Sequence, residues 1–196
     1  ATLTNDKARQ EAIYKKTTEL YPNDFRAYNN LGMMAYANGD LATAENYFKQ
    51  AASKNANAAE VNTNLGLIEL TKGNVANAET YLSKSTGANT ANEALGNLYI
   101  KQGQYDRAVQ AFGDTKTNSA ALAQILAKDY NKAKSTLSAV KNPDAYTNYL
   151  MAVVGARTNN ADLVKSSMDK VKQQDAALAA KAQNDREFAK YANEVK

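Results

Sequence analysis

The sequence repeats one arrangement of small, apolar and turn-forming residues in residues 25–58 and 59–92. Leu31-Gly32 in the first stretch is matched 34 residues later by Leu65-Gly66. The same interval separates Gly39 from Gly73, Ala44 from Ala78, and Phe48 from Leu82. A fixed period of this length is typical of stacked helix pairs, because each pair can bury its apolar side only against its neighbours. The spacing therefore predicts an all-α chain.

Within each repeat, the spacing predicts two antiparallel helices. In the first repeat, Gly32 lies on one helix, and Ala44 and Phe48 form part of the apolar side of the next. We expect Gly32 and Ala44 where the two helices cross, because larger side chains there would separate them, and we expect Phe48 to fill the remaining space. Asn38-Gly39 is also typical of a β-hairpin, but its flanks have helical periodicity, so we predict a turn between helices.

Three complete repeats are predicted within residues 25–112, after which the pattern weakens. Leu95-Gly96 begins the third repeat only 30 residues after Leu65-Gly66. Residues 113–173 keep two degenerate helix pairs, and Asn159 stands where the earlier repeats have a turn glycine. We expect one continuous superhelix of about five helical hairpins.

Both ends of the chain are expected to differ from a complete repeat. Tyr14 lies 34 residues before Phe48, so residues 1–22 are predicted to be the back half of a partial repeat, as in a fragment of a longer protein. Its helix should have an apolar side formed by Ala8, Ala12, Ile13 and Leu20. Residues 175–196 are predicted to form two capping helices, because an open end would expose the core. Their apolar side contains Leu178, Ala179, Ala182, Phe188 and Tyr191.

The composition argues against an enzyme. The chain has no cysteine and no histidine, so thiol chemistry and the commonest general base and metal ligand are absent. The carboxylates Glu60, Glu69, Glu79 and Glu93 lie among amides, lysines and small residues, which is typical of solvated helix faces. No phosphate-binding loop, strained nucleophile turn or metal-ligand spacing occurs in the sequence. We therefore expect no catalysis, no cofactor and no metal.

The charge and hydropathy exclude two further kinds of partner. The net charge of +4 lies entirely in residues 113–196, where the lysines are spread along the predicted helices and not clustered. Nucleic-acid binding needs a concentrated basic surface, so we expect no nucleic-acid partner. No apolar run approaches the roughly 18 residues needed to cross a bilayer, so no direct membrane insertion is expected.

Residues 25–112 resemble the tetratricopeptide repeat (TPR) family through their Leu-Gly pairs, turn glycines and recurring alanines. The resemblance implies a protein-interaction module whose first helices line a concave groove for a peptide or partner helix. By position, the groove-lining candidates are Arg26, Asn29, Asn30, Met33 and Tyr36 in the first repeat, Glu60, Thr63, Asn64 and Leu67 in the second, and Glu93, Asn97, Ile100 and Lys101 in the third.

Two amides at equivalent positions, Asn30 and Asn64, are candidates for holding a peptide backbone, because a side-chain amide both donates and accepts hydrogen bonds. The alternative is that they form hydrogen bonds between helices inside the stack. Asn64 also matches one position of the family's carboxylate-clamp subtype. The other clamp positions hold Asn29, Met33, Thr90 and Ala94 and supply no cation, so we expect no preference for acidic C-terminal peptides.

The whole chain also resembles the repeat region associated with an OmpA-like domain in some bacterial envelope proteins, from residues 1–6 to residues 188–191. That resemblance implies a periplasmic or outer-membrane association through an upstream region. Two alternatives to partner binding remain open: a structural packing or self-association role, and glycan binding by aromatic stacking. The oligomeric state is not predicted. The tyrosines that permit glycan binding, although core packing also explains them, are Tyr28, Tyr36, Tyr47, Tyr81, Tyr99 and Tyr105.

Overall fold

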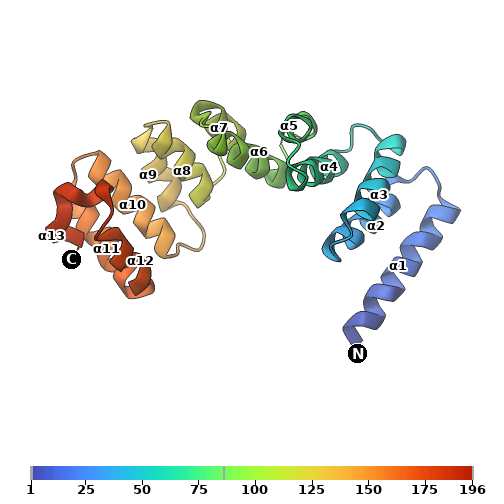
Figure 1. The fold of residues 1–196 in the computed structure, drawn as a ribbon, viewed down its shortest axis with the longest axis horizontal. Helices are drawn as coiled ribbons and strands as arrows, with labels where there is room; N and C mark the ends of the chain where they lie inside the picture. Colours follow the sequence, from blue (N-terminus) through green and yellow to red (C-terminus); the bar gives the residue numbers. More distant parts are fainter. Residues whose placement is uncertain (1, 86, 196) are drawn as a thin grey trace. The chain divides into compact units, whose positions relative to one another are not determined.

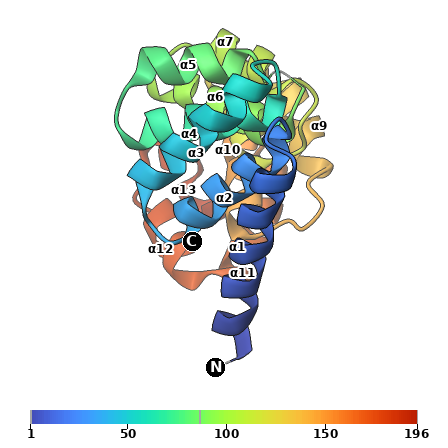
Figure 2. The ribbon, with the colours of Figure 1, turned by 90° about the vertical axis from the view of Figure 1, so that its right-hand side faces the viewer.

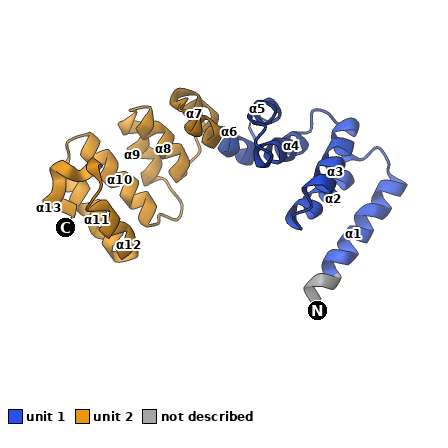
Figure 3. Cartoon of the chain, viewed as in Figure 1, with its two compact units in different colours: residues 1–95 blue, residues 96–196 orange. Residues whose placement is uncertain are grey.

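The computed structural model describes residues 2–85 and 87–195, and within these ranges it contains helices and turns and no strand (Figure 1). The chain divides into two compact units, residues 1–95 (unit 1) and residues 96–196 (unit 2), with the boundary inside α6 (Asn89–Lys101) (Figure 3). The predicted all-α helical-repeat class is confirmed.

Unit 1 consists of antiparallel helix pairs. Its helices before α6 are α1 (Thr2–Leu20), α2 (Phe25–Ala37), α3 (Leu41–Lys54), α4 (Ala59–Thr71) and α5 (Val75–Ser83). α2 packs against α3, and α4 against α5, while α3 also contacts α4. α1 lies beside α2 in both views (Figures 1 and 2). The core between these helices is formed by Ala44, Phe48, Ala51, Ala58, Val61, Leu65 and Ile68.

Unit 2 has two further helix pairs and a short C-terminal segment. After α6 come α7 (Tyr105–Phe112), α8 (Asn118–Leu126), α9 (Tyr130–Ser138), α10 (Ala145–Arg157), α11 (Ala161–Gln174), α12 (Ala176–Ala182), the 3₁₀-helix η1 (Arg186–Tyr191) and α13 (Ala192–Val195). The tail from α12 to α13 contacts α10 and α11. Ala179, Ala182, Phe188 and Tyr191 of this tail are buried, as a cap requires.

The helix crossings show why glycine recurs in the repeats. A Cβ atom added to Gly32 would lie 2.6 Å from the ring of Phe48, which is 1% exposed. A Cβ atom on Gly66 would lie 2.6 Å from the side chain of Leu82. The large residue of the second helix therefore occupies the space that the glycine leaves, as predicted.

The turns between paired helices also follow the prediction. Gly39 and Gly73 have φ angles of +80° and +79°, a backbone conformation that residues with a Cβ atom rarely adopt. In unit 2, Asn159 takes the same left-handed conformation with φ of +55°, as expected from the sequence. Lys128 does so as well, with φ of +64°, and no sequence signal indicated this.

One local expectation is wrong, and one helix ends well before the glycine that follows it. Ile13 and Leu20 of α1 are 56% and 62% exposed, so the predicted apolar side of α1 faces away from α2. α5 ends at Ser83, four residues before Gly87. The hydroxyl of Ser85 donates a hydrogen bond of 2.8 Å to the carbonyl oxygen of Ala59, and Ser85 is fully buried. This contact holds the chain against α4 before Gly87 is reached.

Candidate functional site

A groove with a volume of about 430 Å³ lies within unit 1, on the side of the stack formed by α2, α4 and the start of α6. Most of its walls are apolar, and the ring of Phe48 lies at its base. Volumes of this size are typical of ligand sites that are apolar with a few polar groups. The residues that line it are Met33, Tyr36, Phe48, Ala59, Glu60, Thr63, Asn64, Leu67, Ala88 and Thr90.

Six of the predicted groove residues lie together in this groove. They are Met33 and Tyr36 of α2, with Glu60, Thr63, Asn64 and Leu67 of α4. Met33 and Tyr36 are 52% and 40% exposed, although both side chains are large and mainly apolar. Large apolar groups left in contact with solvent beside a concave surface are typical of a binding face. Binding at these residues stays a prediction.

The other candidates of the first repeat do not line the groove. Arg26 is exposed and forms an ion pair with Asp24, with Nη2 and Oδ2 2.7 Å apart. Asn29 is 6% exposed, and Asn30 is half-buried.

The candidates of the third repeat, all on α6, are also absent from the groove lining. Glu93 belongs to unit 1 and is half-buried. Asn97, Ile100 and Lys101 belong to unit 2, where Asn97 and Lys101 are exposed and Ile100 is half-buried.

Sequence reasoning did not select four of the lining residues. Ala59 begins α4 and Ala88 directly precedes α6, and position alone gives little reason to choose these small residues. From the sequence, Thr90 stands at a carboxylate-clamp position and Phe48 at a core position. For Phe48 the signal is Gly32, because the ring of Phe48 occupies the space that this glycine leaves. No comparable signal marks the other three.

The amides on α2 and α4 form a contact between the repeats. The side-chain nitrogen of Asn64 donates a hydrogen bond of 2.9 Å to the side-chain oxygen of Asn29. Asn64 therefore has the helix-to-helix role that the sequence left as an alternative. Because Asn64 also lines the groove, its side-chain oxygen and its second N–H can still form hydrogen bonds there. The hydroxyl of Thr63 donates to the carbonyl oxygen of Ala59 at 2.8 Å, which leaves its oxygen as an acceptor.

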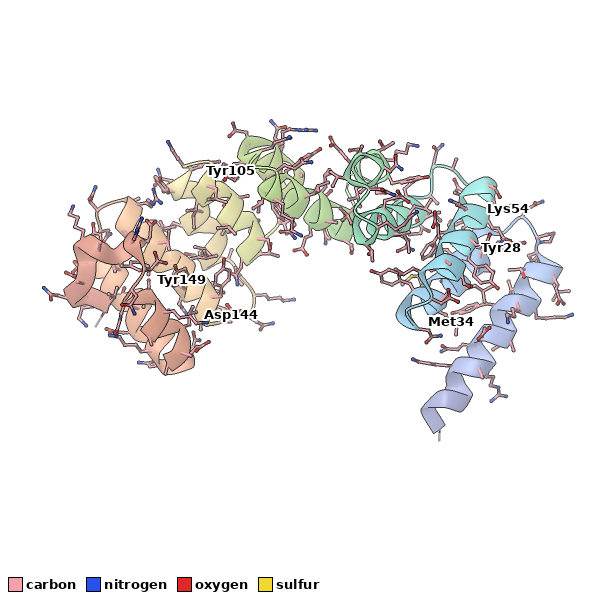
Figure 4. All side chains as sticks on the ribbon, viewed as in Figure 1. Tyr28, Met34, Lys54, Tyr105, Asp144 and Tyr149 are labelled. Carbon is pink, nitrogen blue, oxygen red and sulfur yellow. The ribbon has the colours of Figure 1, made fainter. Side chains whose placement is uncertain are left out.

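Tyr28 and Tyr81 lie outside the groove and pack partly buried against the core of unit 1. The amino group of Lys54 lies 6.0 Å from the centre of the Tyr28 ring, at the end of α3 (Figure 4). The surroundings of these two rings favour a role in helix packing over sugar stacking.

The prediction that Glu69 lies on a solvated face is wrong. Glu69 is 6% exposed, and its carboxylate accepts hydrogen bonds from Lys72 at 3.0 Å, Asn74 at 3.0 Å and Asn77 at 3.1 Å. The hydrogen bond from Lys72 is the main cause that lowers the pKa of Glu69 below its usual value. Lys72 also contacts Glu45 of α3 at 3.2 Å, so the network joins neighbouring repeats. Its role is structural.

The corresponding face of unit 2 is occupied by the chain itself. The hydroxyl of Tyr149 on α10, which is labelled in Figure 4, is hydrogen-bonded to Asp185. The ring of Tyr149 meets that of Phe188 edge-on, with centroids 5.7 Å apart. Arg157 pairs with Glu187, with Nη2 and Oε2 2.7 Å apart. Burial first, and then the hydrogen bond to Asp185, raise the pKa of Tyr149.

Two kinds of site are absent from residues 2–85 and 87–195. No group of carboxylates there is arranged to hold a metal ion. No helix in the same ranges has both the length and the apolar character of a membrane span.

Three family models with the description "Tetratricopeptide repeat" match the chain, over residues 35–94, 13–46 and 92–116. The chain belongs to the tetratricopeptide repeat family, whose members are generally non-catalytic scaffolds for protein-protein interaction. The resemblance to OmpA-associated repeat regions stays a prediction.

Solved structures of similar fold agree with this assignment. YrrB, described as a TPR protein with an unusual peptide-binding site, has a TM-score of 0.66 and 19% identity, covering 86% of this chain and 97% of YrrB. PilF of Pseudomonas aeruginosa has a TM-score of 0.72 and 13% identity, covering 98% and 92%. PilW, a type IV pilus biogenesis factor, has a TM-score of 0.63 and 19% identity, covering 96% and 92%. No curated protein matches the sequence. At these identities the likeness concerns the fold alone.

Proposed function

We propose that this protein is a non-catalytic scaffold that holds a peptide segment of a partner protein in the groove of unit 1. The observation that supports this most strongly is the common groove formed by predicted residues of two successive repeats, Met33 and Tyr36 from α2 and Thr63, Asn64 and Leu67 from α4. YrrB, of similar fold, is described as having a peptide-binding site.

The groove offers an apolar partner side chain a place to leave water. Met33 and Tyr36 of α2, Leu67 of α4 and the buried ring of Phe48 line it together. Burying one large aliphatic or aromatic side chain contributes about 1.5–3 kcal/mol. The polar atoms of Thr63 and Asn64 lie where they can pair with the peptide backbone beside that side chain. We therefore propose an extended segment with at least one apolar anchor.

A bacterial envelope setting is part of the proposal. It rests on the resemblance of the sequence to OmpA-associated repeat regions. The folds of PilF and PilW provide context, since PilW is described as a pilus biogenesis factor.

The test is a peptide selection on the whole chain followed by truncation of the groove wall. A phage-displayed library of short random peptides is selected on the immobilised protein, and enriched peptides are synthesised with a fluorescent label. The double variant Met33→Ala/Tyr36→Ala should weaken their binding by about tenfold in fluorescence anisotropy, because two apolar contacts are lost.

A matched control removes the same kind of surface outside the groove. Ile13→Ala/Leu20→Ala truncates two apolar side chains of α1 that are at least as exposed as Met33 and Tyr36. Its affinity should equal that of the unmodified chain. Equal weakening by the two double variants, no weakening by either, or no enriched peptide at all would show that the groove of unit 1 is not the binding site.

A further inference from the structure

Resting on the proposed function, we infer that the groove of unit 1 selects a peptide with a lysine or arginine next to its apolar anchor. The residue that determines this preference is Glu60. It is exposed, lies in the first turn of α4, and lines the groove beside Thr63 and Asn64.

Glu60 gives the groove a single sign of charge. Among the residues that line it in the described part of unit 1, Glu60 is the only charged one, and none is basic. A cationic side chain entering the groove therefore meets an opposite charge and no like charge. A peptide carboxylate entering the groove would meet a like charge and no opposite charge. This agrees with the expectation that acidic C-termini are not preferred.

The carboxylate of Glu60 has no partner within the described residues. This distinguishes it from the other glutamates on the helices of the first two repeats. Glu45 pairs with Lys49 at 2.8 Å and with Lys72 at 3.2 Å, and Glu69 is held by Lys72 at 3.0 Å. The charge of Glu60 is thus available to a ligand, whereas those of Glu45 and Glu69 are used by the fold.

The neighbouring polar groups of the groove also favour a donor. The proton of the Thr63 hydroxyl is used in the hydrogen bond to Ala59, so Thr63 offers only an acceptor. One N–H of Asn64 is used in the hydrogen bond to Asn29, so its side-chain oxygen remains as a further acceptor beside one N–H. Lysine and arginine side chains are donors only, and they match this set of acceptors.

The apolar wall suits a basic side chain as well as the anchor. Lysine and arginine carry three or four methylene groups before the charge, and these can lie along Met33 and Leu67 while the charged group reaches Glu60. An anchor and an adjacent basic residue therefore use the whole groove.

The place of Glu60 in the first turn of α4 favours an acidic residue even without a ligand. Another acidic residue of the chain, Asp162, serves as a control for that effect. An acidic side chain in the first turn stabilises a helix through its dipole. Asp162 is likewise exposed and is the second residue of its helix, α11, as Glu60 is the second residue of α4. Glu60→Gln and Asp162→Asn should therefore have similar small effects on thermal unfolding, and only Glu60→Gln should change peptide binding.

The experiment repeats the phage selection on the unmodified chain and on Glu60→Lys. We expect the unmodified chain to enrich peptides with a lysine or arginine adjacent to a large apolar residue, and Glu60→Lys to lose that enrichment and favour aspartate or glutamate there. An enriched peptide, synthesised with its basic residue or with glutamine in its place, is then titrated by fluorescence anisotropy.

Glu60→Gln should weaken the basic peptide by about threefold to tenfold and leave the glutamine peptide unchanged, and added salt should reduce the difference. Asp162→Asn should change neither. If Glu60→Lys enriches the same peptides, or Glu60→Gln weakens both peptides equally, the charge preference is wrong while the groove stands. If the affinity of the enriched peptides changes neither with Glu60→Gln nor with Met33→Ala/Tyr36→Ala, the proposed function is wrong as well.

Discussion

The first helix of a pair presents an open face in unit 1 and a covered face in unit 2. α2 and α10 each have 13 residues, so positions in the two helices can be compared by counting from their first residues. Met33 and Val153 are the ninth residues of their helices, and they are 52% and 8% exposed. Asn29 and Tyr149 are the fifth, and Asn29 bonds to the next repeat while Tyr149 bonds to Asp185 of the tail.

This difference shows that the pairing of two helices does not determine whether the outer face of the first helix can bind a partner. In unit 1 that face meets Asn64 of the following repeat and leaves a groove. In unit 2 the segment η1 lies against α10, and Phe188 is buried there at 1% exposure. A short segment after the last pair is therefore enough to bury a helix face that is open to solvent in unit 1.

The largest expected effect comes from removing the side chain that covers α10. Phe188→Ala should destabilise unit 2 by about 3–5 kcal/mol, the usual cost of truncating a fully buried phenylalanine. Hydrogen exchange should show loss of protection in α10 and α12 while α2 and α3 keep theirs. Equal loss in α2 and α3 would contradict the treatment of the two faces as separate.

A smaller effect is expected at the helix crossing of unit 1. Gly32→Val should destabilise the fold by about 1–3 kcal/mol, because its side chain would overlap the ring of Phe48. The same change made together with Phe48→Ala should cost less than the sum of the two single changes, since Phe48→Ala removes the ring atoms that the new side chain would meet. Denaturant unfolding of the two single variants and the double variant measures this coupling. Strict additivity would show that the two side chains do not compete for one space.

The smallest effect concerns pH. The raised pKa of Tyr149 means that the folded state holds this proton more tightly than the unfolded state, in which tyrosine titrates near roughly pH 10. The stabilisation is complete below that pH and decreases above it, by at most about 1.4 kcal/mol per pH unit. Tyr149→Phe should flatten this decrease in thermal unfolding of unit 2. A decrease of the same slope in the variant would assign it to other groups.

The sequence predicted the parts of the fold that depend on local size and conformation. Gly32 with Phe48, and Gly39 with Asn159, could be recognised because their roles follow from having no side chain, a large ring, or a tolerance of positive φ. Six of the groove residues were expected from the resemblance to the tetratricopeptide repeat family, by their positions on the first helices of the repeats.

The parts that were missed depend on which neighbour a residue meets. The buried network of Glu69 exists because Lys72, Asn74 and Asn77 converge on it only after the chain turns from α4 into α5. The outward direction of Ile13 depends on which side of α1 lies against α2. Spacing along one helix contains neither piece of information.

The covering of α10 by η1 also limits how this architecture can be extended. A new helix pair joined after α11 would have to displace Phe188 and the hydrogen bond between Tyr149 and Asp185 before it could dock. Duplication of a repeat ahead of α10 meets no such obstacle. Additional recognition modules, whether acquired by evolution or added by engineering, are therefore most readily accommodated in the N-terminal part of the array.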